Sequence, residues 1–86
     1  MDINQLILLV KNKIEKNIVV QNIAIKDKTH LHIKHKSHTD GKFHLELKLQ
    51  SEELSKFNKI QATKKIYKII DEEMKKYIHS IQILLS

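Results

Sequence analysis

The chain has 86 residues, 41% of them hydrophobic, and its formal net charge is +6. This length predicts a single domain, residues 1–86, with one modest core, because a chain of about this size buries only about 60% of its surface. Cysteine is absent, which excludes disulfides, a thiol nucleophile and a thiolate-ligated metal site built by this chain alone. No apolar run approaches the roughly 18 residues of a membrane span, and no signal-peptide pattern opens the chain, so we expect no membrane contact and a cytoplasmic location.

A helix and then a strand are predicted for the N-terminal part of the chain. Asp2 is a suitable N-cap, because its carboxylate can accept hydrogen bonds from the first backbone N–H groups of a helix. The helix should end near Asn17, and its apolar residues recur at helical spacing: Ile3, Ile7, Val10 and Ile14. From Ile18 to Lys26 the pattern changes to alternation, which predicts a strand.

A long histidine-rich stretch, residues 27–44, separates this strand from the next one. It holds five of the six histidines and the only glycine. The second strand is predicted over residues 43–50, with alternating leucines on one face and His44 on the polar face. The linker of a hairpin needs only about two to five residues, and roughly a dozen are present here. The extra length therefore indicates a functional loop.

The C-terminal half is predicted to contain a short helical turn, a long helix and a last strand. Ser51 caps the turn, and Asn58 with Gln61 forms an amide version of the capping box that opens the longest helix. One face of that helix is expected to comprise Ile60, Thr63, Tyr67, Ile70, Met74 and Tyr77. In the last strand, from Ile78 to Leu85, His79 is expected on the same face as the apolar residues Ile81, Ile83 and Leu85.

This order of elements predicts an α/β chain of the two-layer α+β type, α-β-β-α-α-β. The two strands on either side of the histidine-rich stretch should pair antiparallel. The last strand is joined to the second through the long helix, so it should lie parallel to it by a crossover connection. The expected architecture is a three-stranded mixed sheet with helices on one face, which resembles the type II KH topology.

Four segments, in this order and spacing, resemble the BolA family across nearly the whole chain. They are Asp27–His35 in the histidine-rich stretch, His44–Ser51 in the second strand, Ile66-Tyr67 in the long helix and Ile78–Ile81 in the last strand. Two departures from the family pattern lie nearby. Ala62-Thr63-Lys64 stands where many members have Arg-His-Arg, and Lys56 stands where a glycine is usual.

The resemblance implies a binding module that is not an enzyme. Members of the family pair with monothiol glutaredoxins and share a [2Fe-2S] cluster, for which the glutaredoxin supplies a cysteine and glutathione a second thiolate. By this resemblance His79 is one metal ligand of the present chain. The second is a loop histidine, for which His35 and His32 align best and His38 is the alternative. No cluster is expected on the isolated chain, which we expect to be a monomer or a weak homodimer.

The placement of His79 on an apolar face predicts a partly buried imidazole, since burial favours the neutral form that binds metals. Other interpretations stay open for the histidines. His79 is also consistent with a strand-entrance residue whose ring bonds a backbone carbonyl, and the loop histidines with a solvated, lysine-rich turn. Several histidines within a short stretch are compatible with a zinc site, although no HExxH motif is present.

Nucleic-acid binding is the alternative function, because the net charge is positive and some BolA family members are described as transcription regulators. The candidate contacts are Lys64, Lys65 and Lys68 on the long helix. Every basic residue is lysine, which neutralises phosphate but lacks the planar fork that reads guanine. The Gly-x-x-Gly loop of KH modules is also missing. We therefore expect weak, salt-sensitive DNA binding. No nucleophile–base pair indicates catalysis.

Overall fold

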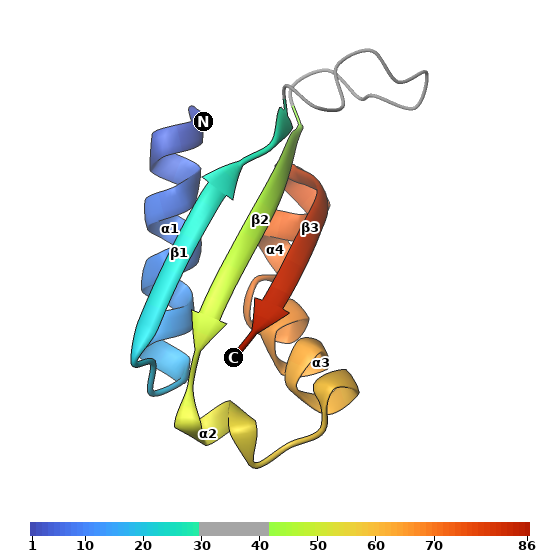
Figure 1. The fold of residues 1–86 in the computed structure, drawn as a ribbon. Helices are drawn as coiled ribbons and strands as arrows, with labels where there is room; N and C mark the ends of the chain where they lie inside the picture. The colour runs from blue at the N-terminus through green and yellow to red at the C-terminus, as the bar shows by residue number, and fades with distance from the viewer. Residues whose placement is uncertain (30–41) are drawn as a thin grey trace.

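The computed structural model describes residues 1–29 and 42–86. Its elements are α1 (Ile3–Asn17), β1 (Asn22–Asp27), β2 (Phe43–Gln50), α2 (Glu52–Ser55), α3 (Lys59–Ile69), α4 (Asp71–Lys76) and β3 (Ile78–Leu85) (Figure 1). The strand order is β1-β2-β3. β1 and β2 pair antiparallel, and β2 and β3 pair parallel, which confirms the predicted mixed sheet.

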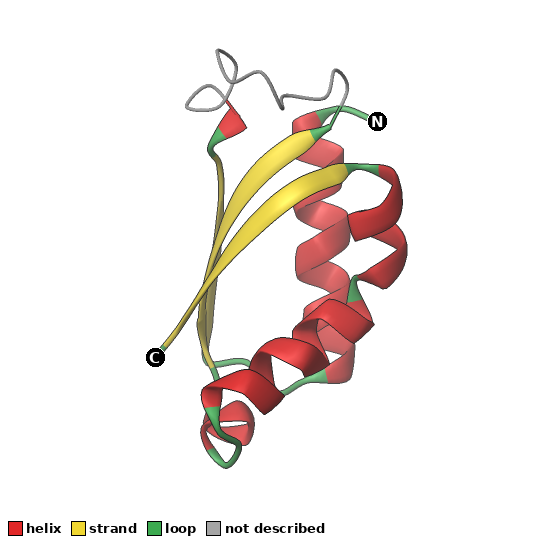
Figure 2. Cartoon of the chain, turned by 90° about the vertical axis from the view of Figure 1, so that its right-hand side faces the viewer, coloured by secondary structure: helices red, strands yellow, loops and turns green. Residues whose placement is uncertain are grey.

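The molecule has two layers, with α1, α3 and α4 on one side of the sheet (Figure 2). Alternation along β2 turns Leu45, Leu47 and Leu49 towards the helices, where they are buried. The core combines these leucines with apolar residues of the helices and of β3. Its buried members are Leu6, Val10, Ile14, Ile18, Leu45, Leu47, Leu49, Leu54, Ala62, Ile66, Ile70, Ile78 and Ile81. Among the described residues, no helix is long and apolar enough to span a membrane.

The N-terminal helix forms as predicted, but the first strand is shorter than expected. The Asp2 carboxylate accepts the Gln5 backbone N–H at 2.8 Å, and the Gln5 side chain returns a bond to the Asp2 backbone, which completes a capping box. The predicted start of β1 at Ile18 is wrong, since the strand begins at Asn22. The carbonyl of Val19 accepts a hydrogen bond from the Ser51 hydroxyl at 2.7 Å, and backbone bonding to β2 begins only with the Gln21 N–H, which donates to the Gln50 carbonyl at 2.9 Å.

The single long helix expected after Asn58 is divided at Ile70 into α3 and α4, and the longest helix is α1. Ile70 has φ −105° and ψ 22°, outside the helical region. The sequence that follows, Asp71-Glu72-Glu73, places three acidic side chains in the first turn of α4. Such residues stabilise the positive end of a new helix dipole, which explains a restart at this point.

The expected apolar face of the long helix is also partly wrong. Its buried residues are Ala62 and Ile66 in α3 and then Ile70, whereas Ile60 is 68% exposed. Ala62 has a short side chain, so hydrophobicity alone did not distinguish it, yet a small residue allows a helix to approach its neighbours closely. The capping box of Asn58 and Gln61 is confirmed.

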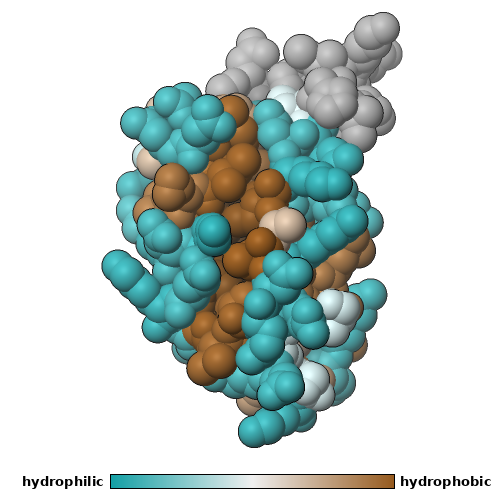
Figure 3. All heavy atoms as spheres, turned by 60° about the vertical axis from the view of Figure 1, so that its left-hand side comes forward, coloured by the Kyte–Doolittle hydropathy of each residue, from teal (hydrophilic) through white to brown (hydrophobic). Residues whose placement is uncertain are grey.

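Apolar side chains also reach the surface on the side of the molecule where α1 and β1 lie (Figure 3). Ile3, Val20, Ile23 and Ile25 are only partly buried there, and they pack against the core. β1 is an edge strand of the described sheet, with β2 as its neighbour. The core is therefore less completely covered along this edge than between β2 and the helices.

Candidate functional site

The candidate site lies at the start of β3, where the pairing of β3 with β2 is irregular. Phe43 is opposite Ile78, but the next residue of β2, His44, is opposite Ser80. His79 is thus an extra residue of β3, as in a β-bulge. The bulge lets Ile78 and Ile81 both enter the core, although three positions separate them.

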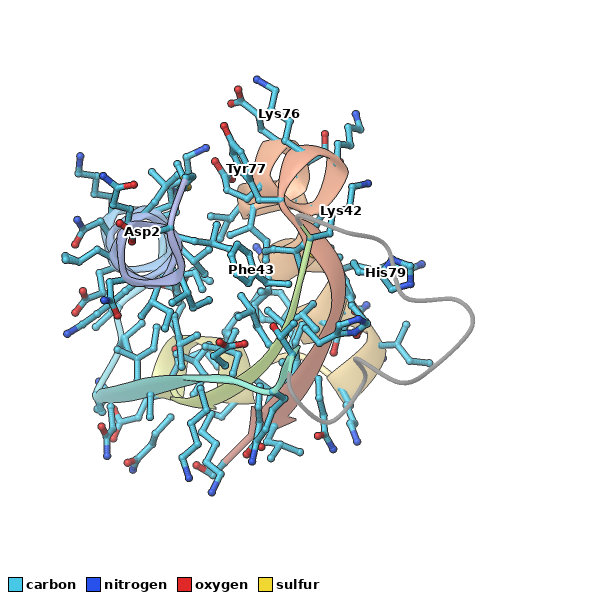
Figure 4. All side chains as sticks on the ribbon, turned by 90° about the horizontal axis from the view of Figure 1, so that it is seen from above. Asp2, Lys42, Phe43, Lys76, Tyr77 and His79 are labelled. Atoms are coloured by element: carbon cyan, nitrogen blue, oxygen red, sulfur yellow. The ribbon has the colours of Figure 1, made fainter. Side chains whose placement is uncertain are left out.

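His79 therefore does not share the apolar face of Ile81, and its expected partial burial is wrong: the residue is exposed. Figure 4 shows its ring projecting from β3 on the side opposite to Phe43 and Tyr77. The physical reason is the bulge, since a regular strand would have placed His79 and Ile81 on one face. The imidazole is accessible to a second molecule.

His44 was predicted to lie on the polar face of the second strand, as a surface or sheet-lining residue. It does lie on that face, opposite Ser80, but it is only 5% exposed. Its Nδ1 is 2.7 Å from the Ser80 hydroxyl, a hydrogen bond whose donor depends on the imidazole tautomer. The rings of His44 and His79 lie with their centroids 4.9 Å apart and their planes at 53°.

The backbone of His44 is held by the end of β1. Its carbonyl accepts the Lys28 N–H at 2.7 Å, and its own N–H donates to the Thr29 hydroxyl at 3.2 Å. The Asp27 carboxylate in turn accepts hydrogen bonds from both the backbone N–H and the hydroxyl of Thr29. These contacts hold the start of β2 in register beside His79.

The contact between the rings of His44 and His79 was not predicted from the sequence. A signal was available, because the buried residues Ile78 and Ile81 are spaced by three in a segment that otherwise alternates. A cavity of about 420 Å³ adjoins His44 and Ser80. Its lining residues are Lys28, His44, Leu45, Glu46, Ser80, Ile81 and Gln82.

The predicted loop ligands His35 and His32, and the alternative His38, lie outside the described residues. Their approach to His79 stays a prediction. Within residues 1–29 and 42–86, no three His, Cys, Asp or Glu side chains are grouped so that they could hold a metal ion. In the described part of the chain, His79 is an exposed imidazole outside any such group.

The candidate nucleic-acid contacts Lys64, Lys65 and Lys68 are all exposed on α3, as expected. The ammonium group of Lys65 lies 4.6 Å from the centre of the Phe57 ring, a cation–π contact. Lys64 and Lys68 lie on the side of the helix that faces away from the buried residues Ala62 and Ile66. The arrangement presents positive charge to solvent.

Known proteins share this geometry and parts of this sequence. The family model described as BolA-like protein matches residues 14–86. No curated protein matches the chain.

Solved structures show the same fold. BolA1 from Arabidopsis thaliana superposes with a TM-score of 0.78 at 22% identity, covering 92% of this chain and 87% of that one. The BolA domain of SufE1 from Arabidopsis thaliana has a TM-score of 0.77 at 19% identity, with coverage of 92% and 87%. The helix–strand order and the sheet topology described above are thus those of BolA structures.

Proposed function

The chain belongs to the BolA-like family, and we propose that it is a non-catalytic binding module that pairs with a monothiol glutaredoxin and co-ligates a [2Fe-2S] cluster. The observation that carries this proposal is the exposed imidazole of His79, which the β-bulge turns out of the core. Such a ligand can reach a metal held on the surface of a second protein. A role in the trafficking of clusters or in iron and redox regulation follows from that partnership.

The donor chemistry of this chain fits a shared cluster better than one it holds alone. The chain has no cysteine, and iron–sulfur clusters are held mainly by thiolates. Two thiolates, from the glutaredoxin cysteine and from glutathione, would be completed by His79 and a loop histidine, His35 or else His32 or His38. When bound, the cluster supplies one-electron redox chemistry, and imidazole ligands in place of thiolates raise its reduction potential.

The chain's own residues have two tasks in this proposal. His79 binds, and it must be neutral at the ligating nitrogen to do so. The residues around it keep it at the surface: Ile78 and Ile81 anchor β3 in the core on either side, at 2% and 8% exposure. The core thereby fixes the backbone of the ligand while its side chain stays accessible.

Native mass spectrometry tests the partnership. A mixture with a monothiol glutaredoxin, glutathione, iron and sulfide should yield a one-to-one complex of the two proteins with one cluster and one glutathione. His79→Ala should yield glutaredoxin homodimers in its place, while Gln82→Ala, another exposed residue of β3, should behave as wild type. Homodimers as the sole cluster-bearing species with the wild-type chain would refute the proposal.

A further inference from the structure

His44, a buried residue next to His79, has a role of its own at this site. His44 and Ser80 lie opposite each other on β2 and β3, directly after the bulge that exposes His79. The His44 ring is buried, whereas His79 and Ser80 are exposed. The accessible imidazole is thus adjacent to an imidazole that is fixed inside the protein.

His44 is held at both its backbone and its ring. Lys28 and Thr29 bond its backbone carbonyl and N–H, and the Ser80 hydroxyl lies 2.7 Å from its Nδ1. A side chain that is 5% exposed and bonded in this way has little freedom to change rotamer. The His44 ring is therefore held in a fixed position, and a neighbouring ring can pack against it.

The His79 ring packs against the His44 ring, with its centroid 4.9 Å from the His44 centroid and a tilt of 53°. This tilted arrangement is within the range that aromatic pairs prefer. An exposed side chain on a strand otherwise samples several rotamers, and each must be given up when a partner binds. Contact with His44 removes part of that freedom in advance.

We propose that His44, fixed by Ser80, is the positioning residue of His79: it holds the exposed imidazole in one orientation before the partner arrives. The inference rests on the proposed function for the identity of the partner, but the ring contact is a property of the free chain. Metal-binding histidines are commonly oriented by a neighbouring group, and the orienting group here is a ring face. His44 is not assigned as a ligand, because its Nδ1 is engaged by Ser80 and its ring is enclosed.

Ser80→Ala tests the positioning role, because it removes the hydrogen bond to His44 at an exposed position and leaves both rings in place. Ser80→Thr restores a hydroxyl with a residue suited to strands and serves as the rescue. Gln82→Ala, exposed and on the same sheet face as Ser80, is the matched control.

The first readout uses the free chain. Nuclear Overhauser contacts between the ring protons of His44 and His79 should be present in the wild type, weakened in Ser80→Ala and retained in Ser80→Thr and Gln82→Ala. The second readout is the affinity for cluster-loaded glutaredoxin, which Ser80→Ala should weaken about two- to tenfold, the range for losing one pre-ordered side chain. Ser80→Thr should recover it.

The outcomes separate this inference from the proposed function. Free wild-type chain with no contact between the two rings overturns the positioning role. The positioning role is also overturned if Ser80→Ala loses the ring contact but binds cluster-loaded glutaredoxin with the affinity of the wild type. A wild-type chain that shows the ring contact but never joins the glutaredoxin refutes the proposed function, while it supports the fixed orientation of His79.

Discussion

Two neighbouring histidines of this chain have opposite environments, and each environment follows from strand pairing. His44 is opposite Ser80 and is enclosed, so its ring nitrogen needs a hydrogen bond, which the serine hydroxyl provides. His79 is the extra residue of the bulge and is exposed. Burial makes the first a structural and positioning group, and exposure makes the second the candidate ligand.

This contrast predicts different costs for removing the two rings. His79→Ala should change the free energy of unfolding by less than about 0.5 kcal/mol, as is usual for exposed positions. His44→Ala should lower it by about 1–3 kcal/mol, since it deletes an enclosed ring and its hydrogen bond. Urea denaturation followed by circular dichroism measures both. Equal losses for the two variants would contradict the assignment of exposed ligand and buried support.

At the scale of single elements, the helix caps and the buried face of β2 were predictable, because they depend on residues that are close together in the sequence. Asp2, Ser51 and Asn58 cap their helices as expected, because a cap needs only a side chain and the N–H groups that follow it. The alternation of leucines in β2 likewise identified the face that packs on the helices.

Features that depend on distant partners were not predictable in the same way. The orientation of His79 is set by its register against Phe43 and His44, far away in the sequence. The long helix that was expected as one element is broken at Ile70, directly before the three acidic residues in the first turn of α4. Whether a loop histidine approaches His79 stays a prediction.

Lys13 joins α1 to α4 through ion pairs with Glu73 and, at 3.8 Å, with Glu72. The Lys13 ammonium donates a hydrogen bond to the Glu73 carboxylate at 2.6 Å, and Glu73 is 2% exposed. The hydrogen bond from Lys13 to Glu73 raises the pKa of Lys13 above its ordinary value of 10.5, against an opposing effect of desolvation. A buried carboxylate is costly without a cation, so this pair ties the two helices together.

Lys13→Met should therefore destabilise the fold, and the loss should depend on pH. Because the pKa of Lys13 is raised on folding, its contribution is fully present below 10.5 and is lost as the pH rises through the higher folded value. The difference in unfolding free energy between wild type and Lys13→Met should shrink between about pH 8 and about pH 11. Urea titrations at both pH values measure it, with the exposed Lys11→Met as control. A difference that stays constant would show that the ion pair is not its source.

At the scale of the whole molecule, exposed lysines and exposed acidic residues lie on consecutive helices. The net charge is +6, and Lys64, Lys65 and Lys68 are exposed on α3. Acidic residues Asp71 and Glu72 follow them at the start of α4, also exposed. Such a surface attracts phosphate through electrostatics but has little to distinguish one base from another.

We expect duplex DNA to bind weakly and to be released between low and moderate salt. Replacing Lys64, Lys65 and Lys68 with Gln should reduce the salt dependence of log K by up to roughly three units of slope, if each lysine neutralises one phosphate. Fluorescence anisotropy over a salt series measures this, and Lys11→Gln with Lys16→Gln on α1 is the control pair. A footprint on one defined sequence at physiological salt, lost in the triple variant, would instead favour a specific DNA-binding function.

In the proposed complex, His79 is the ligand that this chain offers to a cluster held with a glutaredoxin. Visible circular dichroism of the cluster-loaded glutaredoxin, titrated with this chain, tests it most directly, because the signal reports the ligands of the cluster. We predict a new spectrum that is complete at one equivalent of wild-type chain, and no such change with His79→Ala. A glutaredoxin spectrum that the wild-type chain leaves unchanged would contradict the partnership, and a change that survives in His79→Ala would contradict the ligand.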